Sequence, residues 1–109
     1  MAFDERLAER VRSLVARRRG ISEKRMFGGI AFLVRGNMSF GIVGNELMVQ
    51  VGAAQYTKAL ARRHAREMDF TGRPMKGYVY VAAPGLRRLD ALRSWVDIGV
   101  QFARTLPPK

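Results

Sequence analysis

The chain has 109 residues, which fits one small domain, because two domains would each be too small to bury an adequate core. Its 20 lysines and arginines outnumber nine aspartates and glutamates and give a formal net charge of +11, which restricts its partners more than its fold. With no cysteine and one histidine, the sequence excludes disulfides, thiolate nucleophiles and cysteine-based metal centres.

The N-terminal sequence shows no targeting signal. Charged, periodic sequence follows Met1 directly, without the apolar segment that a secretory signal contains. Apolar runs such as residues 30–34 are far shorter than the ~20 residues that span a bilayer. The sequence therefore predicts a cytoplasmic protein that does not enter a membrane.

The first half of the chain predicts one helix followed by an antiparallel meander. Apolar residues recur at the 3.6-residue period over residues 3–19, which indicates an amphipathic helix, and Gly20 is expected to end it. Strands are expected over residues 30–34, 38–43 and 46–51. The Gly36-Asn37 and Gly44-Asn45 pairs between them suit tight hairpin turns. Such short links join only antiparallel neighbours.

The second half predicts a short helix, a long loop, a strand and a long helix. These are expected over residues 53–63, 64–76, 77–81 and 89–106. Gly99 within the last helix is expected to allow close packing against the sheet. The order predicts an α+β fold, in which the N- and C-terminal amphipathic helices pack on an antiparallel sheet of about four or more strands, the meander plus a later strand.

Patterns of catalytic or metal-binding residues are weak. A Ser-His-Asp triad would need His64, and no serine lies in a nucleophile elbow. The spacing of His64, Glu67 and Asp69 matches no recurrent metal motif, and the neighbouring arginines repel a cation. Gly28-Gly29 precedes a predicted strand, which favours a bulge or a close backbone approach over a phosphate-binding loop. We therefore expect no enzyme activity, no metal and no cofactor.

The positive charge is spread over several predicted elements that need not share one face. A protein with this excess of positive charge can bind the phosphate groups of nucleic acid. The sequence shows no helix-turn-helix, zinc finger or aromatic RNA-binding strand, however. Direct nucleic-acid binding is therefore an alternative that the residues leave open. The basic clusters are Arg17-Arg18-Arg19, Lys24-Arg25, Arg62-Arg63-Arg66, Arg73 with Lys76, and Arg87-Arg88.

Two strings carry a more specific signal. Residues 25–32 read R-M-F-G-G-I-A-F, and residues 69–76 read D-F-T-G-R-P-M-K. In this order and separation they closely resemble the N-terminal domain of the TfoX/Sxy competence-regulator family. The resemblance covers nearly the whole chain and implies a small α+β domain of the bacterial cytosol. We expect residues 1–109 to form this single domain, without the C-terminal domain of full-length TfoX regulators.

The resemblance also implies a function. The family's regulator promotes expression of DNA-uptake genes together with the cAMP receptor protein. The chain is therefore expected to be a non-enzymatic regulatory or protein-interaction module, a transcriptional co-regulator with a transcription-related protein partner. An exposed sheet edge would also allow a homodimer.

The expected interaction surface consists of residues from the two strings. Asp69 and Arg73 either take part in binding or only hold their loop closed, and both readings stay open. Beside the regulatory module and direct nucleic-acid binding, a third hypothesis for the function is enzymatic, with a small-molecule site for an anionic ligand around Arg25, Arg73 and Lys76. The surface residues are Arg25, Phe27, Gly28, Gly29, Asp69, Arg73, Pro74 and Lys76.

Overall fold

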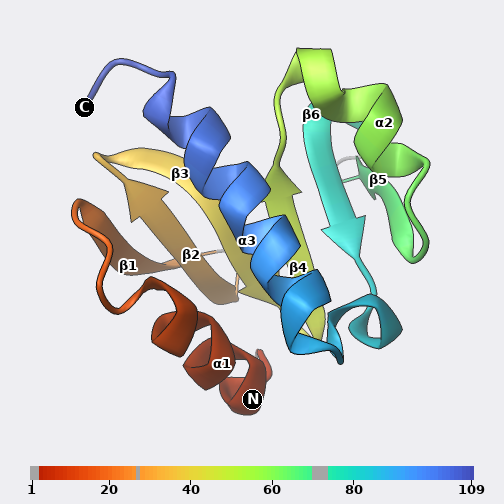
Figure 1. Ribbon diagram of the computed structural model, residues 1–109, viewed down its shortest axis with the longest axis horizontal. Helices are drawn as coiled ribbons and strands as arrows, with labels where there is room; N and C mark the ends of the chain where they lie inside the picture. Colours follow the sequence, from red (N-terminus) through yellow and green to blue (C-terminus); the bar gives the residue numbers. More distant parts are fainter. Residues whose placement is uncertain (1–2, 27, 70–73) are drawn as a thin grey trace.

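A six-stranded antiparallel sheet carries all the helices on one face (Figure 1). The computed structural model describes residues 3–26, 28–69 and 74–109. The strand order is β1-β2-β3-β4-β6-β5. The elements are α1 (Glu5–Val15), β1 (Ile21–Met26), β2 (Gly29–Val34), β3 (Asn37–Val43), β4 (Glu46–Gln50), the 3-10 turn η1 (Ala53–Gln55), α2 (Tyr56–Leu60), β5 (Ala65–Asp69), β6 (Pro74–Val81), the 3-10 turn η2 (Ala83–Leu86) and α3 (Leu89–Arg104).

The α+β architecture and the β2-β3-β4 meander are confirmed, but two strands were not predicted. β1 precedes the meander, and β5 occupies part of the segment expected to be a loop; β6 also begins earlier than expected, at Pro74. Both missed strands lie at the edges of the sheet. β1 has no fully buried residue, so neither hydrophobic alternation nor a continuous apolar run marks it.

Two predicted helix and turn boundaries are wrong. The first helix ends at Val15, so Gly20 is not its cap; Gly20 lies before β1, where its carbonyl accepts a hydrogen bond from the Arg35 N–H at 2.8 Å. The β2–β3 turn uses Arg35 and Gly36, with φ of 53° and 83°, and Asn37 already belongs to β3. Positive φ at both central residues is the type I′ pattern that suits the strand twist.

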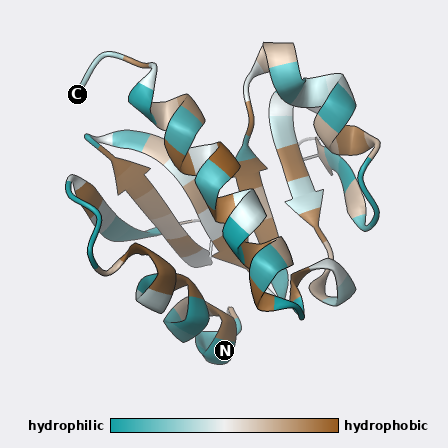
Figure 2. Ribbon diagram, in the orientation of Figure 1, coloured by the Kyte–Doolittle hydropathy of each residue, from teal (hydrophilic) through white to brown (hydrophobic). Residues whose placement is uncertain are grey.

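The main core lies between the helices and one face of the sheet, where brown apolar segments face each other in Figure 2. The rings of Phe32 and Phe40 stack with their centroids 4.8 Å apart. Gly99 permits the expected close approach of α3, since a Cβ there would lie 2.8 Å from the Ser39 carbonyl oxygen. The side-chain alternation of the strands places a smaller cluster, Met48, Met68 and Tyr80, on the opposite face.

Asp4 caps the N-terminus of α1. Its Oδ1 accepts hydrogen bonds from the N–H groups of Arg6 and Leu7, at 2.9 and 3.1 Å. We expect Asp4→Ala to lower the free energy of unfolding by about 1 kcal/mol, because these N–H groups have no partner within the helix. Urea unfolding followed by circular dichroism measures the loss. Asp4→Asn, which keeps the acceptor, should lose much less, and equal losses for both variants would contradict the capping role.

Candidate functional site

One end of the sheet gathers arginines from four separate parts of the chain. Strand pairing places the β1–β2 loop, the β3–β4 turn, the end of β6 and the start of β5 together at this end. It is the lower part of the view in Figure 1, with the N-terminus and the start of α3. We call it the arginine end, defined by Arg6, Arg10, Arg25, Arg62, Arg63, Arg87 and Arg88.

Three open hollows lie along the arginine end, and two backbone features connect them. Phe3 lines the first hollow and forms a bridge with Gly44, next to the Asn45 that lines the second. The 3-10 turn η2 separates the second hollow from the third: Ala83, Leu86 and Arg87 face one side, whereas Pro84, Gly85 and Arg88 face the other. The hollows therefore form a series along one basic end.

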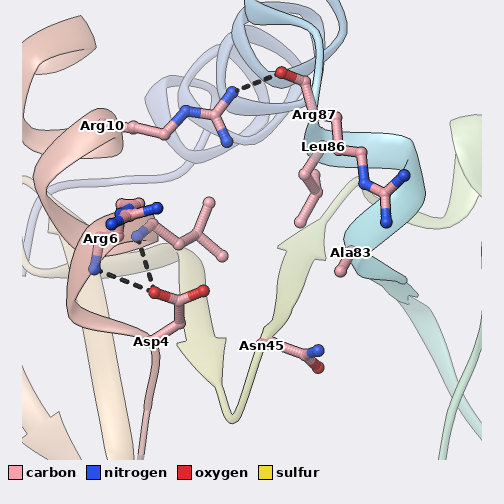
Figure 3. Close-up of a pocket in the computed structure, with 8 residues that line it drawn as sticks. Asp4, Arg6, Arg10, Asn45, Ala83, Leu86 and Arg87 are labelled. Carbon is pink, nitrogen blue, oxygen red and sulfur yellow. Dashed lines mark hydrogen bonds between the residues drawn. The ribbon is translucent and has the colours of Figure 1, made fainter.

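The middle hollow, of about 310 Å³, lies between α1, the β3–β4 turn and η2 (Figure 3). Its floor includes the buried side chains of Leu7 and Leu86. Arg10 closes one side, because its Nη2 donates a hydrogen bond to the carbonyl oxygen of Arg87 at 3.1 Å. This bond ties α1 to the residue that follows η2. The hollow combines an apolar floor with an arginine rim.

The third hollow, which we call the Trp95 pocket, measures about 360 Å³. Arg62 stacks over the ring of Trp95, with 3.9 Å between its Cζ and the ring centroid, and its Nη1 donates to Ser94 Oγ at 3.2 Å. Burial lowers the pKa of Arg62, although arginine stays protonated in proteins. The remaining lining comes from Arg63, His64, Pro84, Gly85, Arg88 and Ala91.

His64, which lines the Trp95 pocket, has an unusual backbone conformation. His64 has a φ of 69°, which costs a residue with a side chain about 1 to 2 kcal/mol. Its carbonyl accepts the Ala82 N–H at 2.9 Å, and Gly85 leaves room for its side chain, since a Cβ on Gly85 would lie 2.9 Å from the His64 Cβ. Strained residues of this kind often occur at functional sites.

Few carboxylates balance the arginine end. Asp90 pairs with Arg88 at 3.2 Å, but both side chains are more than two-thirds exposed, so the pair contributes little. Asp4 is engaged as the cap of α1. Among the described residues, the other ion pairs involve Arg12, Arg18 and Arg66, none of which lines the three hollows. Most of its cations therefore have no acidic partner among the described residues.

The structure separates the residues of the expected interaction surface. Arg25, Gly28 and Gly29 line the first hollow, of about 280 Å³, where Arg25 lies 5.5 Å from the centre of the Phe3 ring. The described residues of the second string lie at the other end of the sheet and beyond three further strands, where Asp69 pairs with Pro74 and Lys76 follows in β6. Arg25 and Lys76 are therefore not brought together around one anion. Phe27 and Arg73 lie outside the described residues.

The arginine end was only partly visible in the sequence. The Arg62-Arg63 and Arg87-Arg88 clusters stood out, but their convergence depends on β5 and β6 being neighbours. Arg6 and Arg10 lie on the polar face of the first predicted helix, and nothing else in the sequence marks them as part of a binding surface. Trp95 is buried in the core, and no pattern in the sequence links it to Arg62.

Fold and surface together define a small, basic α+β domain with a positively charged end. The TfoX N-terminal domain family matches residues 13–103, and the chain belongs to this family. No curated protein and no solved structure matches the chain. Within the described part of the chain, no helix has the length and apolarity needed to cross a membrane.

Proposed function

We propose that this domain is a non-enzymatic regulatory module that binds nucleic acid through its arginine end. The observation that carries the proposal is the convergence of seven arginines at one end, of which Arg88 alone forms a salt bridge among the described residues. Arginine binds phosphate through two parallel N–H donors, and phosphate contacts release counterions from the nucleic acid.

The arginine end suits contact with the phosphate backbone more than reading of sequence. Its cations come from α1, β1, the α2–β5 turn and the residues around η2, and no helix carries more than two of the seven, which are Arg6 and Arg10 in α1. Backbone contacts position a protein without specifying sequence. This supports an accessory role beside a sequence-specific regulator, in keeping with the co-regulator role that resemblance to TfoX/Sxy implies.

Salt dependence of binding tests this proposal. We expect fluorescence anisotropy with a labelled duplex of arbitrary sequence to show affinity falling steeply from about 50 to 200 mM salt. Arg6→Gln, Arg10→Gln and Arg87→Gln combined should reduce the slope of log affinity against log salt by about three, roughly one per lost phosphate contact.

A matched control removes the same charge elsewhere. Arg17, Arg19 and Arg104 are exposed and follow or end helices at the opposite end of the molecule. Their combined replacement by glutamine should leave the slope nearly unchanged. Equal slopes for the two triple variants, or no binding of the unmodified protein at about 50 mM salt, would refute the proposal.

An acidic protein surface is the second candidate partner. The observation that favours it is the middle hollow, whose apolar floor of Leu7 and Leu86 and rim of Arg6, Arg10 and Arg87 resemble a protein interface, where arginine is enriched. A pull-down from bacterial cytosol with and without nuclease separates the candidates. A partner retained after nuclease treatment and lost with the Arg6, Arg10 and Arg87 triple variant favours the protein.

A further inference from the structure

Like the middle hollow, the Trp95 pocket is lined by three arginines, but its lining also includes a histidine and the tryptophan. Arg62, Arg63 and His64 line it from the turn after α2, and Arg88 lines it from the start of α3. Pro84 and Gly85 of η2 form the wall between these two segments. No carboxylate of the described residues lines this pocket.

Arg62 is held in place but has spare hydrogen-bonding capacity. Its Cζ lies 3.9 Å from the centre of the Trp95 ring, and Ser94 Oγ accepts one of its hydrogen bonds. A guanidinium carries five N–H donors, so the described residues leave most of them unused. A partly buried cation without a counter-charge is costly, and an anion in the pocket would offset that cost.

The number of cations indicates what kind of anion fits. Three arginines face one hollow, beside the ring nitrogens of His64, whereas a carboxylate brings one negative charge and two oxygens. A phosphomonoester brings a charge of about −1.5 to −2 at neutral pH and three acceptor oxygens. Arg88 is free to turn toward such a ligand, because its pair with Asp90 is exposed and weak.

We infer that the Trp95 pocket is a binding site for a phosphomonoester group, with Arg62 as the fixed donor and Arg63, His64 and Arg88 closing around the phosphate oxygens. The group comes either from a free phosphorylated small molecule or from the phosphorylated end of a nucleic acid strand. This site goes beyond the proposed function, because it does not require binding along a nucleic acid backbone.

Trp95 provides a direct reporter, because it is the only tryptophan in the chain and Arg62 lies on its ring. Titration of the protein with inorganic phosphate at constant ionic strength should change its emission in a saturable, single-site manner, and chloride should not. Adenosine 5′-monophosphate should bind, and adenosine should not. A linear, non-saturating response equal to that of chloride would overturn the inference.

Substitutions of Arg62 test whether phosphate binds in the Trp95 pocket. Arg62→Gln should weaken phosphate binding by at least about tenfold, since a hydrogen bond to a charged group contributes about 1.5 to 3 kcal/mol. Arg62→Lys should recover only part of it, because lysine lacks the planar pair of donors. Arg104→Gln removes the same charge at the other end of α3 and should change affinity less than about twofold.

A second variant covers the case in which Arg62→Gln disturbs the fold. Arg63→Gln with Arg88→Gln changes two side chains that are exposed, so its circular dichroism should match that of the unmodified protein while phosphate binding weakens by about tenfold. Unchanged phosphate affinity in this variant would overturn the inference.

Oligonucleotides with and without a 5′-phosphate distinguish the two sources. Tighter binding of the 5′-phosphorylated strand than of the same strand without the phosphate identifies a strand end, and equal binding of the two strands identifies a small phosphorylated molecule. The Arg6, Arg10 and Arg87 triple variant should keep its phosphate affinity. Failure of this inference is therefore separable from failure of the proposed nucleic-acid binding.

Discussion

Trp95→Ala is expected to lower the free energy of unfolding by about 3 to 5 kcal/mol, the usual cost of removing a buried aromatic side chain. Trp95 is 1% exposed and packs in the main core between α3 and the sheet. Small domains have stabilities of about 5 to 15 kcal/mol, so the variant should be close to unfolding. The substitution also removes the ring over which the Arg62 guanidinium lies.

Urea unfolding followed by circular dichroism measures this loss, since the variant has no tryptophan emission. Leu89→Ala is the matched control on the same helix, because Leu89 is 54% exposed. Its effect should stay within about 0.5 kcal/mol. Similar losses for the two variants would show that α3 does not pack on the sheet as described.

Gly29→Ala is expected to lower the free energy of unfolding by about 3 kcal/mol, at the upper end of the cost of overpacking. A Cβ on Gly29 would fall inside contact distance of the Ile42 carbonyl oxygen. The obstacle is backbone of the neighbouring strand β3, so no side chain can turn aside to make room. β2 and β3 would have to separate where they pair.

Gly44→Ala separates crowding from backbone conformation. Gly44 has a φ of 61°, and a Cβ there meets nothing within 4 Å. Its replacement should therefore cost only the positive-φ penalty, about 1 to 2 kcal/mol. Thermal or urea unfolding of both variants gives the comparison. A larger loss for Gly44→Ala than for Gly29→Ala would contradict the crowding at Gly29.

The elements that bury a continuous apolar face were predictable, and those that do not were missed. The sequence of α3 has the hydrophobic period of a helix. The strands β2, β3 and β4 were recognisable from their apolar segments. β1 reads Ile-Ser-Glu-Lys-Arg-Met and β5 reads Ala-Arg-Glu-Met-Asp, and edge strands of this polarity have no distinct period. Hydrogen bonds to neighbouring strands, which the sequence does not display, make them strands.

The candidate site was less predictable than the fold, because it depends on which strands are neighbours and on which of their ends lie together. Gly28-Gly29 was interpreted as a bulge or a close backbone approach, and Gly29 shows the close approach, because a Cβ there would meet the Ile42 carbonyl oxygen. The grouping of Arg62 with Arg88 follows from the order of β6 and β5 in the sheet. The placement of Asp69 and Arg25 at opposite ends follows from the same order, and no spacing in the sequence encodes it.

The C-terminal residues are fastened at the far side of the molecule from the seven arginines. The Lys109 N–H donates to the Arg35 carbonyl at 2.8 Å, and the Asn37 amide donates to the Pro107 carbonyl at 2.8 Å. Phe3, by contrast, lies beside Gly44, at the basic side. A surface-immobilised protein should therefore be tethered through its C-terminus, which leaves the cationic side facing solution, whereas an N-terminal tether would crowd it against the support.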